Sequence, residues 1–232
     1  MFKRPHTTFL VSIPVLTTST SMASDVLVEA ESFKDPGGWV LDPQFLDTMG
    51  SPYLLAHGLG KPVENATTEI EFPESGQYVV WVRTKNWVPK WSPGQFKLLV
   101  DGKELQPVFG TGQDDWAWHR GGTIDVTKPR VRLELNDLTG FDGRCDAIFF
   151  TTRQKFIPPN QPGPSMQKWR KSLLGLPTVP PSAGHFDVVV VGGETGRCSW
   201  SQSYGLGVET GLQCGEEACQ FEELGFCVSV SG

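Results

Sequence analysis

The sequence predicts a mainly β protein, built as an antiparallel β-sandwich that is followed by a proline-rich linker and an incomplete α/β fragment. Two observations carry this prediction. Between Val26 and Thr151 the chain alternates short apolar and polar runs, separated by turn-forming residues. Beyond that segment prolines and glycines are frequent until a run of branched aliphatic residues over 187–191. Several short strands in one block are typical of a sandwich, and a late aliphatic run is typical of an α/β unit.

The strands are predicted from this alternation and from the turns between them. In chain order they cover residues 26–30, 68–72, 78–82, 96–100, 103–105, 131–135 and 147–150. Tyr78, Val80 and Val82 share one face of their strand, because side chains alternate across a sheet. Asp101 and Gly102 predict a type I′ hairpin turn, since both residue types tolerate the positive φ angles that this turn requires.

The segment 156–185 is predicted to be a linker that contains one short helix. Its proline-rich first part cannot build a core. Ser165 is the candidate N-cap of an amphipathic helix over 166–174, which Gly175 and Pro177 would end. The predicted domains are a signal segment at 1–23, a β-sandwich at 24–155, the linker at 156–185 and an α/β fragment at 186–232.

The first 23 residues have the pattern of a secretory signal peptide. Lys3 and Arg4 give a basic start, residues 9–16 are mostly apolar, and small residues precede a cleavage point before Ser24. The protein is therefore expected to be secreted or periplasmic. The alternative is a disordered N-terminus rich in Thr and Ser.

Composition and charge exclude some classes of partner. The chain has 232 residues, 11% of them aromatic and 38% hydrophobic, which indicates a globular protein. Its net charge is −6, and the densest basic cluster is only residues 168–171, so nucleic acid is not expected as a partner. No stretch approaches the roughly 18 apolar residues that a membrane span needs.

Six of the eight tryptophans lie in the predicted β-sandwich, and four of these lie between its strands. The four are Trp87, Trp91, Trp116 and Trp118, with Asp114, Asp115 and Arg120 beside the second pair. Indole rings stack on the apolar face of a sugar, while carboxylate and guanidinium groups bind its hydroxyls. The pattern therefore predicts that these seven residues bind carbohydrate. In the alternative the tryptophans fill the ends of the sandwich, as Trp81 is predicted to fill its core.

Several motifs resemble known families. Residues 28–33 and 146–150 resemble the opening and closing strands of galactose-binding-like, jelly-roll carbohydrate-binding modules. Residues 37–39, 49–58 and 137–147 resemble the N-terminal module of secreted bacterial FAD-dependent oxidoreductases. The resemblance covers about residues 26–155 and implies a jelly-roll sandwich that recognises carbohydrate.

The resemblance also implies a structural calcium ion. In modules of this type calcium lies beside the opening glutamates, which makes Glu29, Glu31 and Asp146 the candidate ligands. Calcium prefers oxygen ligands such as these. The alternative is that the three are solvated carboxylates at strand ends.

The aliphatic run and the glycines after it resemble the first strand and turn of the flavin domain in the same oxidoreductases. A strand that leads into a glycine turn lets backbone amides approach a pyrophosphate at a helix N-terminus. Gly192, Gly193 and Gly196 are the candidate FAD-binding residues, with Glu216 or Glu217 for the ribose.

This glycine fingerprint departs from its pattern at two positions. Starting at Gly192, the pattern needs glycine at 194 and a small residue near 197, where this chain has Glu194 and Arg197. A carboxylate there repels phosphate and blocks close approach, so pyrophosphate binding is expected to be impaired. We interpret 186–232 as the start of a flavin domain that is truncated or disrupted by a frameshift.

Three functions remain open from sequence alone. The first is a secreted carbohydrate-binding module, inactive as an enzyme by itself. The second is an FAD-dependent oxidoreductase that acts on sugar-like substrates, completed by further chain or a partner. The third is a structural sandwich that packs against a flavin domain. His57 and His119 have no partner at a readable spacing, so no catalytic residue is predicted.

Overall fold

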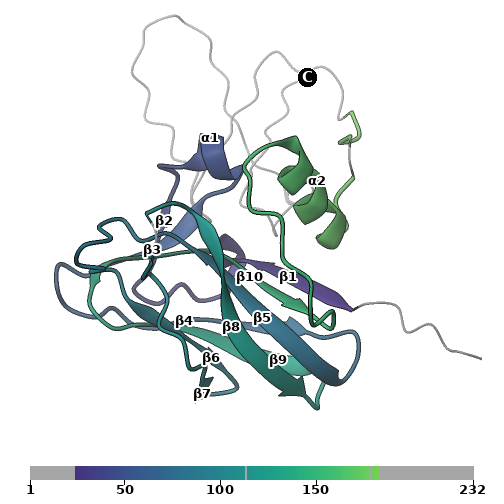
Figure 1. Ribbon diagram of the computed structural model, residues 1–232, viewed down its shortest axis with the longest axis horizontal. Coiled ribbons are helices and arrows are strands. Elements are labelled where there is room, and N and C mark those ends of the chain that lie inside the picture. Colours follow the sequence, from purple (N-terminus) through teal and green to yellow (C-terminus); the bar gives the residue numbers. More distant parts are fainter. Residues whose placement is uncertain (1–23, 113, 178, 183–232) are drawn as a thin grey trace, which may run out of the picture.

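The computed structural model describes residues 24–112, 114–177 and 179–182, which form a sandwich of two antiparallel β-sheets (Figure 1). The predicted mainly β fold class is therefore confirmed. The predicted signal peptide at 1–23 and the predicted flavin-domain start at 186–232, with Gly192, Gly193, Gly196 and Glu216, lie outside the described residues.

The larger sheet has six strands, and β10 lies at its centre. Its strands are β1 (Asp25–Glu29), β2 (Val40–Asp42), β3 (Tyr53–His57), β5 (Gly76–Thr84), β8 (Ala117–Val126) and β10 (Phe141–Thr151). The order is β2-β3-β10-β5-β8, and β1 pairs with the second half of β10, from Ala147 to Thr151. The first half of β10 pairs with β3 instead. The first and last strands of the sandwich are thus neighbours.

The smaller sheet has four strands in the order β4-β9-β6-β7. Its strands are β4 (Ala66–Glu71), β6 (Phe96–Val100), β7 (Lys103–Glu104) and β9 (Arg130–Asp137). Strands β6 and β7 form the predicted hairpin, and Asp101 and Gly102 have φ angles of 49° and 74°. The predicted turn with two positive φ angles is confirmed, because Asp and Gly adopt this conformation with little strain.

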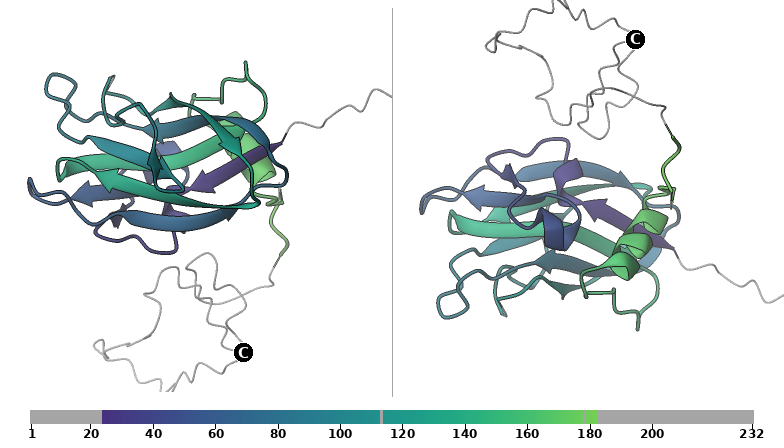
Figure 2. Two further views of the ribbon diagram at one scale, coloured as in Figure 1. Left: turned by 90° about the horizontal axis from the view of Figure 1, so that it is seen from below. Right: turned by 90° about the horizontal axis from the view of Figure 1, so that it is seen from above.

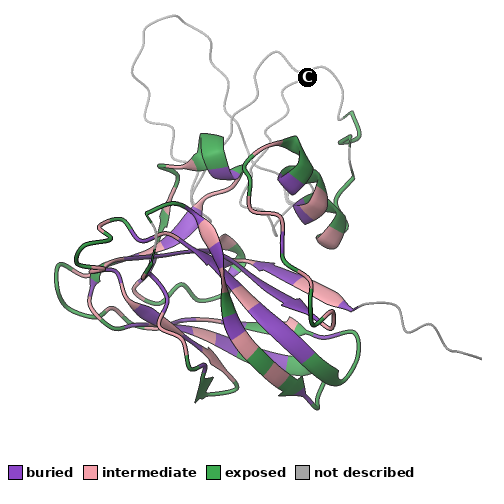
Figure 3. Cartoon of the chain, in the orientation of Figure 1, coloured by how far each residue is buried: buried purple, intermediate pink, exposed green. Residues whose placement is uncertain are grey.

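The main core lies between the two sheets, where buried residues concentrate (Figure 3). Tyr78, Val80 and Val82 all lie in it, as their alternation predicts. Trp81 does not: it is partly buried on the opposite face of β5, beside Trp118. The prediction for Trp81 was wrong in its location, because a strand with 80 and 82 in the core turns 81 outward.

In the described part of the chain, three short helices accompany the strands. They are η1 (Ala30–Ser32), α1 (Leu46–Met49) and α2 (Pro164–Leu173), and α1 and α2 lie on the same side of the sandwich (Figure 2). None of the helices formed by the described residues has the length and apolar character that crossing a membrane requires.

Helix α2 lies within the predicted linker and packs against the outer face of the larger sheet. Its Trp169 contacts Phe149 and Trp118 with ring centroids 5.1 and 6.0 Å apart. The helix begins at Pro164 after Gly163, and Ser165 makes no cap, in contrast with the predicted start at 166. Proline at the first helical position has the required φ and no N–H to satisfy, which favours the earlier start.

Candidate functional site

Three loops meet at one end of the sandwich, and we call this region the loop end. They are residues 58–65 after β3, 85–95 after β5 and 138–140 before β10. The amides of Gly58 and Gly60 both donate to the carbonyl of Gly140, at 3.0 and 3.2 Å, and the Leu138 amide donates to the Gln95 carbonyl at 3.0 Å. Main-chain hydrogen bonds therefore join the three loops.

The buried carboxylate of Asp137 joins two of these loops. Its Oδ1 accepts from the amides of Thr139 and Gly140, at 3.1 and 3.0 Å, and its Oδ2 accepts from the amide of Val63 at 2.9 Å. Gly140 has a φ of 69°, and a Cβ there would lie 2.1 Å from the Lys61 carbonyl oxygen. Only glycine fits this close backbone approach.

Large aromatic side chains are exposed at the loop end. Trp87, Trp91 and Phe141 are 41%, 69% and 50% exposed. The Trp87 indole N–H donates to the Phe141 carbonyl at 3.1 Å, and the Arg144 guanidinium lies 5.5 Å from the Trp87 ring centroid. The Trp87 ring is thus oriented by a hydrogen bond and by a cation–π contact while much of its surface stays open to solvent.

A β-bulge brings polar groups next to this aromatic surface. Strand β10 has one extra residue, Asp142, between the pairs Phe141–His57 and Gly143–Ala56. Asp142 has a φ of 61°, and its Oδ1 lies 2.6 Å from His57 Nδ1. Bulges re-aim side chains, and strained backbone is frequent at functional sites.

The loop end also carries other backbone strain. Leu59 and Ser92 have φ angles of 51° and 44°, and Leu59 is 81% exposed. Together with Asp142 they are three of the four non-glycine residues with positive φ among the described residues; the fourth is the hairpin residue Asp101. A left-handed, exposed leucine is unusual, which singles out this end of the molecule.

The predicted carbohydrate-binding tryptophans separate into two groups. Trp87 and Trp91 lie at the loop end, but Trp116 and Trp118 are only 3% and 9% exposed. The Trp116 ring packs 4.9 Å from Tyr53, and the Trp118 indole donates to the Pro159 carbonyl at 3.0 Å. Trp116 and Trp118 therefore offer no open face for stacking, and this part of the prediction is corrected. The turn formers before β8 suggested an exposed loop, but α1 and the chain that leads to α2 cover these rings.

The predicted polar partners are exposed but lie beside the loop end rather than in it. Asp114 and Asp115 precede β8, where the Asp114 carbonyl accepts from the Lys85 ammonium group and Asp115 Oδ1 accepts from the Trp116 amide at 2.7 Å. Arg120 lies exposed on β8, paired with Trp81. A role of these three in binding stays a prediction.

Sequence reasoning missed Phe141, Asp142 and Arg144, and it left His57 without a partner. His57 and Asp142 are 85 positions apart, so their pairing depends on the register of β3 and β10. The one local signal was the pair of glycines at 140 and 143, which enclose an aromatic and an acidic residue.

The structure brings the three candidate calcium ligands to one place, where they meet arginines. Arg170 of α2 donates from Nε to Glu29 at 2.9 Å and from Nη1 to Asp146 Oδ2 at 3.0 Å. Arg83 donates to the same Asp146 oxygen at 2.9 Å. Within the described ranges no group of three or more His, Cys, Asp or Glu side chains is arranged to hold a metal ion. The calcium site stays a prediction.

Glu31 is the third carboxyl of this group and differs from the other two. Its Oε2 is buried with no hydrogen-bond partner. Burial, and then the nearby Glu29 carboxylate, raise the pKa of Glu31 from 4.5 to about 8. Burial also raises the pKa of Glu29, although Arg170 opposes this. Glu31 is therefore mostly protonated at neutral pH.

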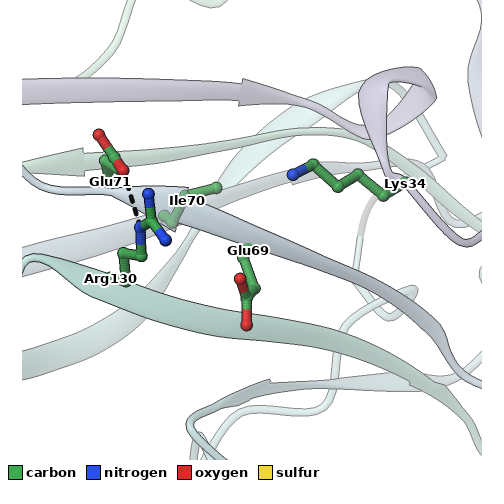
Figure 4. A pocket seen from close by; sticks show the side chains of 5 residues that line it. All are labelled: Lys34, Glu69, Ile70, Glu71 and Arg130. Carbon is green, nitrogen blue, oxygen red and sulfur yellow. Dashed lines mark hydrogen bonds and ion pairs between the residues drawn. The ribbon is translucent and has the colours of Figure 1, made fainter.

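An open pocket at β4, the edge strand of the smaller sheet, is a weaker candidate (Figure 4). It is lined by Lys34, Glu69, Ile70, Glu71 and Arg130. Arg130 and Glu71 form an ion pair of 2.8 Å, with both side chains about 70% exposed. Exposed ion pairs of this kind are typical of a solvated strand face and contribute little to the stability of the fold.

Comparisons with known proteins found similarity only among solved structures. No protein-family model matches the sequence, and no curated protein matches it significantly. A GH26-CBM35 β-(1,4)-mannanase of Podospora anserina is 16% identical with a TM-score of 0.45, over 61% of this chain and 29% of that one. A family 35 carbohydrate-binding module of Clostridium thermocellum is 16% identical with a TM-score of 0.45, over 55% of this chain and 97% of the module. The CBM36-1 domain of a multidomain xylanase from the hindgut metagenome of Trinervitermes trinervoides is 14% identical with a TM-score of 0.42, over 54% and 95%. The chain thus spans less than a third of the length of the mannanase.

Proposed function

We propose that the β-sandwich is a carbohydrate-binding module whose ligand lies on the loop end, against Trp87 and Phe141. The observation that carries the proposal is the Trp87 ring, which is oriented by Phe141 and Arg144 while it stays 41% exposed. A ring that is already held loses little conformational freedom when a ligand binds. Its open surface is an apolar face of the kind that stacks on a pyranose ring.

The polar groups beside these rings suit the hydroxyls of a sugar. His57 is more than half exposed and lies opposite Phe141 in the sheet, and the Asp142 carboxylate is within hydrogen-bond distance of it. A sugar needs hydrogen-bond donors and acceptors around an apolar platform. The loop end offers both within a few residues of one another.

Retention of the full chain in native gels that contain soluble polysaccharide tests this proposal. The gels would contain mannan, xylan, galactan, β-glucan or a uronic-acid-rich pectin. We expect at least one of these polysaccharides to retain the protein. Trp87→Ala and Phe141→Ala should each weaken the binding free energy by about 1–3 kcal/mol, the scale of one buried apolar side chain, and so reduce retention.

Ile157→Ala is the matched control for these variants. Ile157 is 74% exposed and follows the other end of β10, far from the loop end. It should be retained like the unchanged protein. Equal retention of all three variants would exclude the loop end, and migration of the unchanged protein unaffected by every polysaccharide would contradict the proposed function.

We also propose, from sequence alone, that the module is secreted and derives from an FAD-dependent oxidoreductase whose glycine fingerprint is altered here. The support is the signal-like pattern at 1–23 and the aliphatic run and glycines over 187–196, with Glu194 and Arg197 against pyrophosphate binding. N-terminal sequencing of the exported protein should begin at Ser24, and the purified chain should be colourless. A yellow protein with flavin absorbance would instead support the oxidoreductase function.

A further inference from the structure

Arg170 lies 141 residues after Glu29, yet its guanidinium is buried against the sandwich. Its side chain is 6% exposed, and it forms ion pairs with Glu29 at the end of β1 and with Asp146 of β10. Its Nη2 also lies 3.3 Å from the Ser51 hydroxyl and 3.2 Å from Asp146 Oδ1. One side chain of α2 thus contacts β1, β10 and the chain before β3.

The buried charges of this cluster balance without a metal ion. Arg83 and Arg170 contribute two positive charges, and the ionised Glu29 and Asp146 contribute two negative charges. The third carboxyl, Glu31, forms no ion pair with the described residues, and its Oε2 is buried with no hydrogen-bond partner there. A buried charge is tolerated when it is paired and hydrogen-bonded, and here each ionised carboxylate meets a guanidinium.

A calcium ion does not fit this arrangement. Calcium takes six to eight oxygen ligands. Both oxygens of Asp146 already accept from Arg170, and one accepts from Arg83 as well. An added divalent cation would therefore lie beside two guanidinium groups.

We infer that Arg170 is the built-in cation of this carboxylate cluster, in the place that the family resemblance gives to calcium, and that it makes α2 an integral part of the module. Other contacts of the helix agree with this. Met166 is fully buried, and Trp169 packs on Phe149 and Trp118. The folded unit therefore extends to Gly175, whose φ of 68° ends the helix, and the linker begins only there.

Thermal unfolding of the full chain, with and without a chelator or added calcium chloride, tests the inference. We expect the unfolding midpoint of the unchanged protein to be the same in all three conditions. Arg170→Met keeps the apolar stem but removes the charge, and it should lower the midpoint by roughly 10 °C, because it leaves the buried Glu29 carboxylate without its partner and leaves Asp146 with Arg83 alone.

Lys171→Met is the matched control, since Lys171 is the exposed neighbour of Arg170 on the same helix. The Lys171→Met variant should have the same unfolding midpoint as the unchanged protein. The inference would be overturned if the midpoint of the unchanged protein fell with chelator and rose with calcium. It would also be overturned if Arg170→Met and Lys171→Met had the same unfolding midpoint.

If Arg170→Met does not fold, hydrogen exchange of the unchanged protein tests the inference instead. Amides of α2 should then be protected as strongly as those of β10, because the two elements unfold together. Exchange of the α2 amides at the rate of a free peptide would show that the helix is not part of the module.

Discussion

The replacement of Glu31 by glutamine is expected to stabilise the protein, and more so as the pH rises. Glutamine has nearly the same shape but cannot ionise. The folded protein holds Glu31 in an environment that raises its pKa from 4.5 to about 8, chiefly through burial and then through Glu29. In the unfolded chain the carboxyl returns to its ordinary pKa.

The direction of the effect follows from where the proton is bound. Below pH 4.5 Glu31 is protonated in both the folded and the unfolded state, so it adds no pH dependence to the free energy of unfolding. Between pH 4.5 and about 8 the unfolded chain releases the proton and the folded protein keeps it, so the free energy of unfolding falls as the pH rises. The slope from this one group is at most about 1.4 kcal/mol per pH unit.

The magnitude is bounded by the same difference in pKa. The whole interval from 4.5 to about 8 corresponds to at most about 5 kcal/mol. Because part of the Glu31 side chain remains in contact with water, we expect Glu31→Gln to raise the free energy of unfolding by about 2–3 kcal/mol at pH 8 and by almost nothing at pH 4.5.

Urea unfolding of both proteins across this pH range measures the effect. Other groups face the cluster: Glu29 from β1, Arg83 from β5, Cys145 and Asp146 from β10, and Arg170 from α2. Comparison of the variant with the unchanged protein at each pH removes most of their contribution. Glu69→Gln, at an exposed position of β4, is the control and should show no pH-dependent difference. Parallel stability curves for Glu31→Gln and the unchanged protein would refute the reasoning.

Two further predictions concern buried groups, Asp137 at the loop end and Trp118 under α2. Asp137→Ala removes the acceptor of three backbone amides and should lower the free energy of unfolding by about 3 kcal/mol in urea, with faster hydrogen exchange at Val63 and Gly140; unchanged exchange at both amides would mean that the carboxylate does not hold the loops. Trp118→Ala should cost about 3–5 kcal/mol of stability, because it removes a ring packed between Phe149 and α2, yet leave carbohydrate retention of the folded protein intact. If the folded Trp118→Ala variant lost retention, Trp118 would belong to the binding surface after all.

Local features of this protein could be predicted from the sequence because their causes are local. Alternation identified most strands of both sheets, and Asp101 with Gly102 identified the hairpin, since turn chemistry depends on adjacent residues. The presence of α2 was also predicted. The prediction erred for Trp116 and Trp118, because their exposure depends on which element packs over them. For Trp81 the alternation with Val80 and Val82 already placed the ring on the opposite face.

The sequence by itself therefore determined the fold class, the turns and two of the exposed aromatic residues, Trp87 and Trp91. Only the tertiary structure decided that Asp142 meets His57 across 85 residues and that Arg170 meets Glu29 across 141. Such pairs arise from strand order, register and helix packing, which bring distant segments together through contacts that no short pattern encodes. Both the proposed ligand surface and the buried charge cluster depend on contacts of that long-range kind.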